Sequence, residues 1–236
     1  MGGITGILLN WKRPANVERI AAGWRAQGTV TEAIIWNNNR EMPLGPITGA
    51  TVINASEDLG LYTRFAAVCL ARNECVLIQD DDLELPRPSL AALYDAWNAD
   101  PEILHGVFGR NARADGSYAQ SVSGDADVSV VLTRVLFTHR RYAARFFEIA
   151  PRFAEIQRDS QPAGNGEDIL FNYVVQKSSG RLNRIHNIAV TELPAEHAIY
   201  QRNLNAHAAH RTRLMRACAE WLKSPPEVAN QIPTHR

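Results

Sequence analysis

The chain has 236 residues, which is enough for one large domain with a substantial hydrophobic core. Its 45% hydrophobic and 21% charged residues are typical of a soluble globular protein and exclude a disordered chain. The 25 basic and 25 acidic residues balance, so no overall field attracts nucleic acid or an anionic membrane, and any phosphate must be bound by a local site.

A membrane-spanning protein and a disulfide-linked scaffold are also excluded by the sequence. No apolar run approaches the roughly 20 residues that a membrane span needs. The N-terminal apolar patch is followed, not preceded, by Lys12 and Arg13, which is the wrong order for a signal peptide. The three cysteines form no CxxC pair. We therefore expect a cytoplasmic protein without a membrane span.

The first half of the chain alternates short apolar runs, typical of buried strands, with segments whose apolar residues recur at helical spacing. In chain order, the predicted elements are strand 4–9, a helix from Pro14 to near Gly28, strand 33–36, strand 52–53, helix 62–71 and strand 75–78. This order predicts an open α/β sheet with crossover connections. Such sheets bind ligands at the carboxyl ends of their strands, where polar residues stand at 10–13, 37–39 and 80–82.

The second half is less regular. Its predicted elements are helix 88–97, strand 107–108, a polar, loop-rich insertion at 110–127, strand 128–132, helix 142–153, helix 169–175 ending at Gly180, and helix 214–222. The paired prolines at 225–226 begin a loose tail over 225–236. There is no internal repeat or low-complexity linker, so we predict a single domain.

Asp80, Asp81 and Asp82 follow the apolar run 75–78 after a single residue, Gln79, and are the sharpest chemical signal. Carboxylates packed this closely raise one another's pKa unless a cation neutralises them. Oxygen ligands of this kind suit Mg²⁺ or Mn²⁺, which complete their shell with water and substrate phosphates. The alternative is a solvated acidic turn that precedes the next helix.

Two further groups of polar residues share the strand ends or the start of a helix. Arg13 and Arg64 are candidates for phosphate or base contacts, or for surface ion pairs. Asn37 and Asn38 either contact a nucleobase or form a turn. Glu167 and Asp168 follow a glycine-flanked turn and begin a predicted helix; they either cap that helix or face a reacting group.

These segments resemble the exostosin-type glycosyltransferases of the GT-A fold, an open mixed sheet flanked by helices. The resemblance is carried, in order, by residues 9–14, by Ile34-Ile35-Trp36-Asn37-Asn38, by residues 64–82 with the aspartates, by Gly166-Glu167-Asp168-Ile169 with Asn172, and by Ala195-Glu196-His197 with Gln201-Arg202. Residues 1–100 would then be the nucleotide-sugar half of the domain, and residues 101–224 the acceptor-side and catalytic half.

The resemblance implies a retaining transferase that moves a sugar from a UDP-sugar to a hydroxyl of a glycan or glycoside. It implies Asp82 as the main ligand of Mn²⁺ (or Mg²⁺), with Asp80 and Asp81 near the sugar and ribose. It also implies that the uridine end of the donor is held by Arg13, Asn37, Asn38 and Arg64. Asp168 would lie beside the anomeric carbon, with Glu167 supporting it. Arg202 or His197 would contact the diphosphate.

Other readings remain open from the residues alone. A sugar-phosphate nucleotidyltransferase also uses an α/β sheet and Mg²⁺, but it normally has a glycine-rich loop after the first strand, where this chain has 10–14 without glycine. A dehalogenase-like phosphatase needs a hydroxyl residue shortly after its aspartate, and residues 83–85 supply none. A non-catalytic carbohydrate-binding protein of the same fold is the remaining alternative.

Overall fold

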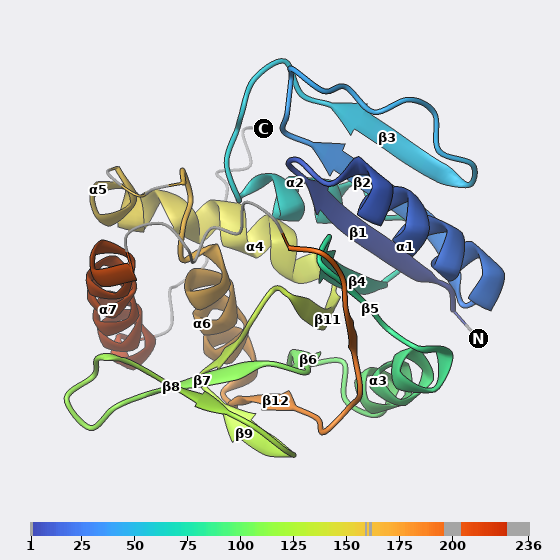
Figure 1. The fold of residues 1–236 in the computed structure, drawn as a ribbon. Coiled ribbons are helices and arrows are strands. Elements are labelled where there is room, and N and C mark those ends of the chain that lie inside the picture. Colours follow the sequence, from blue (N-terminus) through green and yellow to red (C-terminus); the bar gives the residue numbers. More distant parts are fainter. Residues whose placement is uncertain (1, 159, 161, 196–203, 226–236) are drawn as a thin grey trace, which may run out of the picture.

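An eight-stranded mixed sheet with helices on both faces forms the centre of the structure, a computed structural model that describes residues 2–158, 160, 162–195 and 204–225 (Figure 1). The strand order in this sheet is β3-β2-β1-β4-β11-β6-β12-β9. Its strands are β1 (Ile4–Asn10), β2 (Val30–Asn37), β3 (Ala50–Asn54), β4 (Cys75–Asp80), β6 (His105–Gly106), β9 (Ala126–Val128), β11 (Val135–His139) and β12 (Asn183–Ile185). The mixed α/β prediction is confirmed.

Two smaller sheets accompany it. One has the order β10-β7-β8, formed by β7 (Gly109–Ala112), β8 (Tyr118–Val122) and β10 (Val130–Val131). The other pairs β5 (Leu83–Glu84) with β13 (Thr191–Glu192) in antiparallel fashion. The helices are α1 (Pro14–Gln27), α2 (Thr63–Cys69), α3 (Arg87–Ala99), α4 (Arg141–Ile149), the 3₁₀ turn η1 (Ala150–Phe153), α5 (Ala154–Gln157), α6 (Glu167–Ser179) and α7 (Leu204–Lys223).

The four strands β3, β2, β1 and β4 run parallel, and their register aligns their carboxyl ends. Asn10 pairs with Asn37, and Asn37 pairs with Asn54 on the next strand. On the other side, Leu9 pairs with Asp80. The polar residues that end these strands therefore lie along one edge of the sheet, as the sequence predicts.

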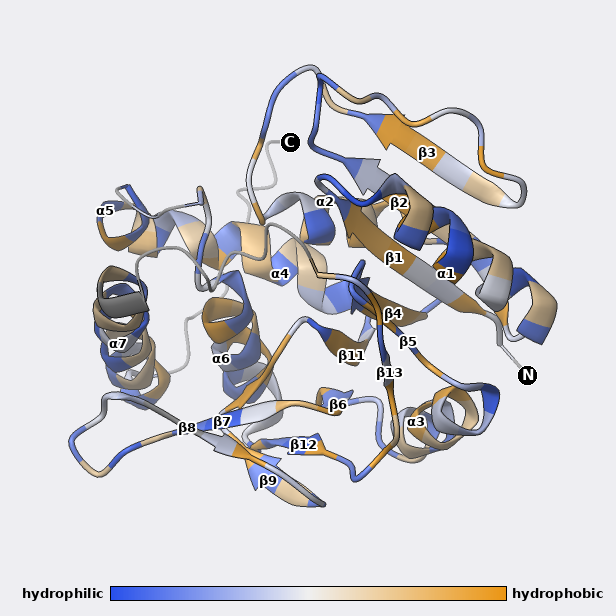
Figure 2. Cartoon of the chain, in the orientation of Figure 1, coloured by the Kyte–Doolittle hydropathy of each residue, from blue (hydrophilic) through white to orange (hydrophobic). Residues whose placement is uncertain are grey.

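Strands β1 and β4 at the centre of the sheet are buried on both faces, which explains why they appear in the sequence as apolar runs. Ile7 and Ile78 belong to the core under α2, α4, α6 and α7, whereas Leu8 and Leu77 belong to the core under α1 and α3. Figure 2 shows hydrophobic colour along β1 and β4, between these two helical layers.

Gly6 is the close-packed point between β1 and α1. A β-carbon there would lie 2.4 Å from the ring of Trp24. The indole is 2% exposed, so it has no room to move away. Gly28, in the left-handed conformation with φ 74°, then ends α1 by donating its N–H to the Trp24 carbonyl.

The second half departs from the sequence prediction in several places. Residues 107–108 are not a strand, because the chain passes there from β6 in the large sheet to β7 in the three-stranded one. The insertion 110–127 is not mainly loop: it contains the β7–β8 hairpin and part of β9. The predicted strand 128–132 is split between β9 and β10, and β11 was not predicted. Within the described part of the chain, no helix combines the length and apolarity that a membrane crossing needs.

Candidate functional site

The acidic triplet lies where the sequence predicts it, at the carboxyl end of β4. Asp80 is the last residue of that strand, and Asp81 and Asp82 form the turn into β5. The backbone of the turn is fixed on both sides: Asp80 N–H donates to the Arg134 carbonyl over 2.9 Å, and Leu193 N–H donates to the Asp82 carbonyl over 2.7 Å. The turn is therefore held between β11 and the segment that follows β13.

Two arginines lie beside Asp81 and Asp82 and offset their negative charge. Arg13, which directly precedes α1, donates a hydrogen bond to Asp81 and lies 3.9 Å from Asp82. Arg134 lies 3.4 Å from the Asp82 carboxylate and 2.7 Å from Glu192, with its guanidinium over the ring of Phe108 at 4.5 Å. Burial nevertheless raises the pKa of Asp81 to about 6, against the opposing effect of Arg13 and with a further contribution from Asp80.

Arg64 joins the triplet to the second acidic pair. This α2 side chain is buried; its Nη1 donates to Asp80 Oδ1 over 3.0 Å, and its Nε lies 3.4 Å from Glu167 Oε1. One guanidinium thus contacts acids that are far apart in the sequence. The two acidic groups that the sequence singles out form a single site.

Glu167 is held at the start of α6 by Gly166, which adopts φ 90° and precedes the helix. The carboxylate is 3% exposed and accepts a hydrogen bond from Thr133 Oγ1 over 3.2 Å. Burial raises the pKa of Glu167 to about 7, with the neighbouring charge of Asp168 acting in the same direction and Arg64 opposing both. Glu167 therefore exchanges its proton near neutral pH.

Asp168 has a different partner. Its Oδ2 accepts a hydrogen bond of 2.5 Å from Nη2 of Arg211 in α7, and its Oδ1 accepts the N–H of Ile169 over 2.8 Å. Tyr118 Oη accepts from the same Arg211 nitrogen over 3.0 Å. The Asp168 side chain is therefore held between the first turn of α6 and the guanidinium of Arg211.

Asn37 and Asn38 lie at the same edge of the sheet, but their side-chain amides form hydrogen bonds with other residues of the protein. Asn37 accepts from Asn10 over 2.8 Å and donates to Asn54 over 2.9 Å. Asn38 donates to the Gly60 carbonyl over 2.9 Å and so holds the loop that leads into α2. These contacts fix the loops at the carboxyl ends of β2 and β3. A nucleobase contact by either residue stays a prediction.

His197 and Arg202 lie outside the described residues, so their predicted contact with the diphosphate stays a prediction as well. The sequence reasoning did not single out three side chains that the structure brings to the acids: Thr133, Arg134 and Arg211.

A divalent metal fits this donor set in one way. Among the described residues, no three or more His, Cys, Asp or Glu side chains are grouped to enclose a cation. Asp82, with its side chain 13% exposed at the mouth of the triplet, can offer a carboxylate oxygen. Mg²⁺ and Mn²⁺ sites of this kind take one or two protein oxygens and complete their shell with phosphate and water. The triplet fits a cation that is shared with a diphosphate.

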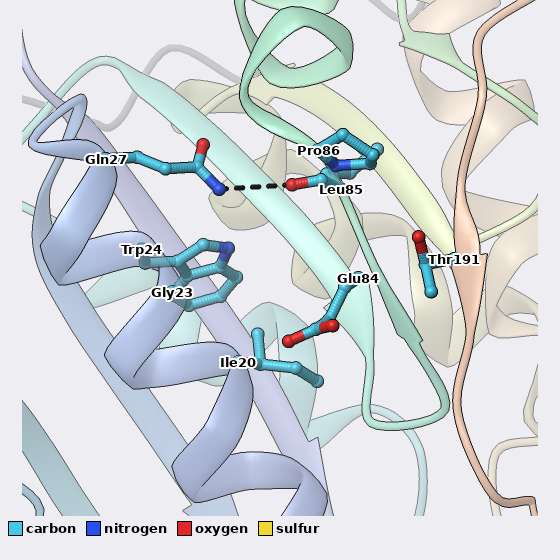
Figure 3. A pocket seen from close by; sticks show the side chains of 8 residues that line it. All are labelled: Ile20, Gly23, Trp24, Gln27, Glu84, Leu85, Pro86 and Thr191. Carbon is cyan, nitrogen blue, oxygen red and sulfur yellow. Dashed lines mark hydrogen bonds between the residues drawn. The ribbon is translucent and has the colours of Figure 1, made fainter.

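The hollow drawn in Figure 3 is a separate feature. It has a volume of about 190 Å³ between α1, β5 and Thr191 and contains none of the predicted site residues. Gln27 donates to the Leu85 carbonyl over 3.1 Å across it, and Glu84 is paired with Arg19. These polar groups are used within the protein, so the acidic edge of the sheet is the better candidate site.

Comparisons with known proteins agree with this fold. The chain resembles GalNAc-T7, solved with UDP, GalNAc and Mn²⁺, at TM-score 0.63 and 9% identity over 82% of this chain and 44% of that one. It also resembles the mannosyltransferase PcManGT from Pyrobaculum calidifontis, solved with GDP-Man and Mn²⁺, at TM-score 0.57 and 15% identity over 96% of this chain and 66% of that one.

The chain thus spans less than two thirds of either solved protein. At these identities the likeness establishes the fold, which is that of the GT-A glycosyltransferases. No curated protein matches the sequence. The profile of the glycosyl transferase family 64 domain, however, matches residues 5–232, nearly the whole chain. The chain therefore belongs to the glycosyl transferase family 64 domain family.

Proposed function

We propose that this protein is an exostosin-type, retaining glycosyltransferase that uses Mn²⁺ or Mg²⁺ and a UDP-sugar to glycosylate a hydroxyl of a glycan or glycoside. The observation that carries the proposal is the contact of Arg64 with both Asp80 and Glu167, which joins the triplet and the second acidic pair into one site. The two solved glycosyltransferases of the same fold, one crystallised with UDP and Mn²⁺ and the other with GDP-Man and Mn²⁺, support a nucleotide-sugar donor and a divalent cation.

The donor side of the site is the triplet and its arginines. Asp82 would hold the divalent cation, which neutralises the charge that develops on the leaving diphosphate. Asp80 and Asp81 are assigned to the sugar and ribose hydroxyls, because carboxylate oxygens accept hydrogen bonds from hydroxyl groups. Arg13 and Arg64 are assigned to the uridine end, together with Asn37 and Asn38. His197 or Arg202 is assigned to the diphosphate.

The reacting side is the start of α6. Asp168 is proposed to lie beside the anomeric carbon, where an ionised carboxylate stabilises the positive charge that builds up as the bond to the diphosphate breaks. Glu167 supports it by hydrogen bonding to Thr133 and by its contact with Arg64. The buried setting strengthens each of these electrostatic interactions relative to water.

Isothermal titration calorimetry of UDP with and without Mn²⁺ tests the donor half of the proposal. We expect Mn²⁺ to raise UDP affinity by at least about tenfold, equivalent to about 1.4 kcal/mol. Asp82→Asn should abolish that gain, whereas Asp95→Asn, an exposed aspartate of α3, should keep it. Binding of UDP that is indifferent to Mn²⁺ in the wild type would contradict the proposal.

A screen of nucleotide-sugars for Mn²⁺-dependent hydrolysis tests the reacting half and identifies the sugar. Asp168→Asn should keep UDP affinity and lose turnover, because its proposed contact is with the reacting carbon and not with the nucleotide. Equal losses of affinity and turnover would instead assign Asp168 to donor binding.

A further inference from the structure

Arg211 is the buried cation on the reacting side of the site. It comes from α7, which packs against α6 and β8 (Figure 1). Its side chain is 7% exposed and its guanidinium contacts three polar side chains. Nη2 donates to Asp168 over 2.5 Å and to Tyr118 Oη over 3.0 Å, and Nη1 donates to Asn165 Oδ1 over 3.4 Å.

The guanidinium has little freedom to leave this position. It lies over the ring of Tyr118 at 4.5 Å, and the Tyr118 N–H is itself bonded to Thr212 Oγ1 of α7 over 3.1 Å. On the opposite side, His210 Nε2 is 2.9 Å from the Asn165 carbonyl. Contacts with β8 and with the turn before α6 thus hold the side chain of Arg211 in place on α7.

The start of α6 is also fixed directly against α7. A β-carbon on Gly166 would lie 2.6 Å from a methyl group of Leu214, one turn along the helix from Arg211. A side chain at this position would have to displace the buried Leu214. The backbone that carries Asp168 and the helix that carries Arg211 therefore share one rigid arrangement.

The two arginines are divided between the neighbouring acids. Arg64 contacts Asp80 and Glu167, whereas Arg211 makes its closest contact with Asp168. Adjacent buried carboxylates destabilise each other's charge, so each needs a cation close by. Glu167, whose contact with Arg64 is 3.4 Å long, is the acid that takes up a proton near neutrality.

A buried ion pair is weak evidence for a purely stabilising role, since well-packed apolar residues often replace one without loss. The reacting carbon needs a carboxylate that is both charged and held at a fixed angle. We propose that Arg211 is a positioning residue, held in place by Tyr118 and Asn165, that directs the Asp168 carboxylate at the reacting sugar. This inference rests on the proposed role of Asp168.

The test is a set of variants assayed for UDP–Mn²⁺ affinity by calorimetry and for kcat of donor hydrolysis. Arg211→Met should lower kcat by about a hundredfold or more, the order expected when a reacting group is misplaced, and leave UDP affinity within about twofold. Arg211→Lys keeps the charge and should recover part of kcat. Arg216→Met is the matched control on the same helix: its ion pair with Asp115 is exposed, and kcat should not change.

A double-mutant cycle covers the case in which Arg211→Met alone fails to fold because it strands a buried carboxylate. If Arg211 acts through Asp168, then Arg211→Met/Asp168→Asn should be no slower than Asp168→Asn. A double variant that is at least tenfold slower than Asp168→Asn would overturn the inference, as would an Arg211→Met variant with wild-type kcat. Absence of turnover in the wild type would refute the proposed function itself, and this inference with it.

Discussion

Asn172 offers a sharp test of how α6, the helix that begins with Glu167 and Asp168, is anchored to the sheet. Its buried amide lies in the middle of α6 and connects that helix to two strands. Oδ1 accepts the N–H of Val131 in β10 over 2.7 Å and Nδ2 of Asn183 in β12 over 2.8 Å. Nδ2 donates to the carbonyls of Val131 over 2.8 Å and Asp168 over 2.7 Å. The Asn172 side chain thus fixes the distance between the sheet and the start of α6, where Glu167 and Asp168 lie.

Asn172→Ala should therefore destabilise the whole domain. At least two buried donors, Val131 N–H and Asn183 Nδ2, lose an acceptor, and each such loss costs about 1–3 kcal/mol. We expect the free energy of unfolding to fall by about 3 kcal/mol, a large part of the roughly 5–15 kcal/mol of a typical domain. The melting temperature should fall by about 6–12 °C.

Urea unfolding followed by circular dichroism measures the change, provided that the m-value stays constant between variants. Asn98→Ala is the matched control, because this asparagine is exposed on α3. Its unfolding free energy should stay within about 0.5 kcal/mol of the wild type. If Asn172→Ala costs less than about 1 kcal/mol, the reasoning that ties α6 to the sheet through this amide is refuted.

Two further predictions concern Glu167 and Gly6. Because burial raises the pKa of Glu167 from 4.5 to about 7, the folded state loses stability as pH rises through that range. Glu167→Gln should be more stable than the wild type at pH 8, by up to about 3 kcal/mol, and should lose the advantage near pH 4; urea unfolding at both pH values decides. Gly6→Ala places a methyl group 2.4 Å from the Trp24 ring and should destabilise by about 1–3 kcal/mol. Gly23→Ala, in α1 with open space around the added carbon, should instead stabilise by up to about 1 kcal/mol, and equal melting temperatures for both variants would contradict the packing argument.

The parallel half of the fold could be predicted because its signals are local. Strands β1, β2 and β4 are buried on both faces and therefore appear as unbroken apolar runs, and Gly28 marks the end of α1 where its left-handed conformation is needed. The second half has strands of two to five residues that exchange partners between sheets. Short strands of this kind gain their stability from pairing over long sequence distances, which periodicity does not reveal.

The acidic residues of the candidate site could be predicted from the sequence, whereas most of the arginines that pair with them could not. Asp80 to Asp82 stand out because they lie at the end of an apolar strand, whereas Arg134 precedes β11, a strand that the sequence reasoning missed. Arg211 did carry a signal. It lies one turn before Leu214 and two turns before Cys218, on the buried face of α7. A charged residue on the apolar face of a helix indicates a buried partner, even though the sequence does not identify that partner as Asp168.

The exposure of the arginines divides the site into an adaptable part and a fixed part. Arg13 and Arg134, beside Asp81 and Asp82, are 16% and 29% exposed, whereas Arg64 and Arg211 are 6% and 7% exposed. The pair of Arg134 with Glu192, with side chains 29% and 60% exposed, is open to water, and such a pair contributes only about 0–1 kcal/mol, so a ligand can displace Arg134 from Glu192 and Asp82 at small cost. Breaking a buried pair by removing one partner costs about 3–5 kcal/mol. Ligand binding is therefore expected to rearrange the contacts of Asp82 while Asp168 stays where α7 holds it.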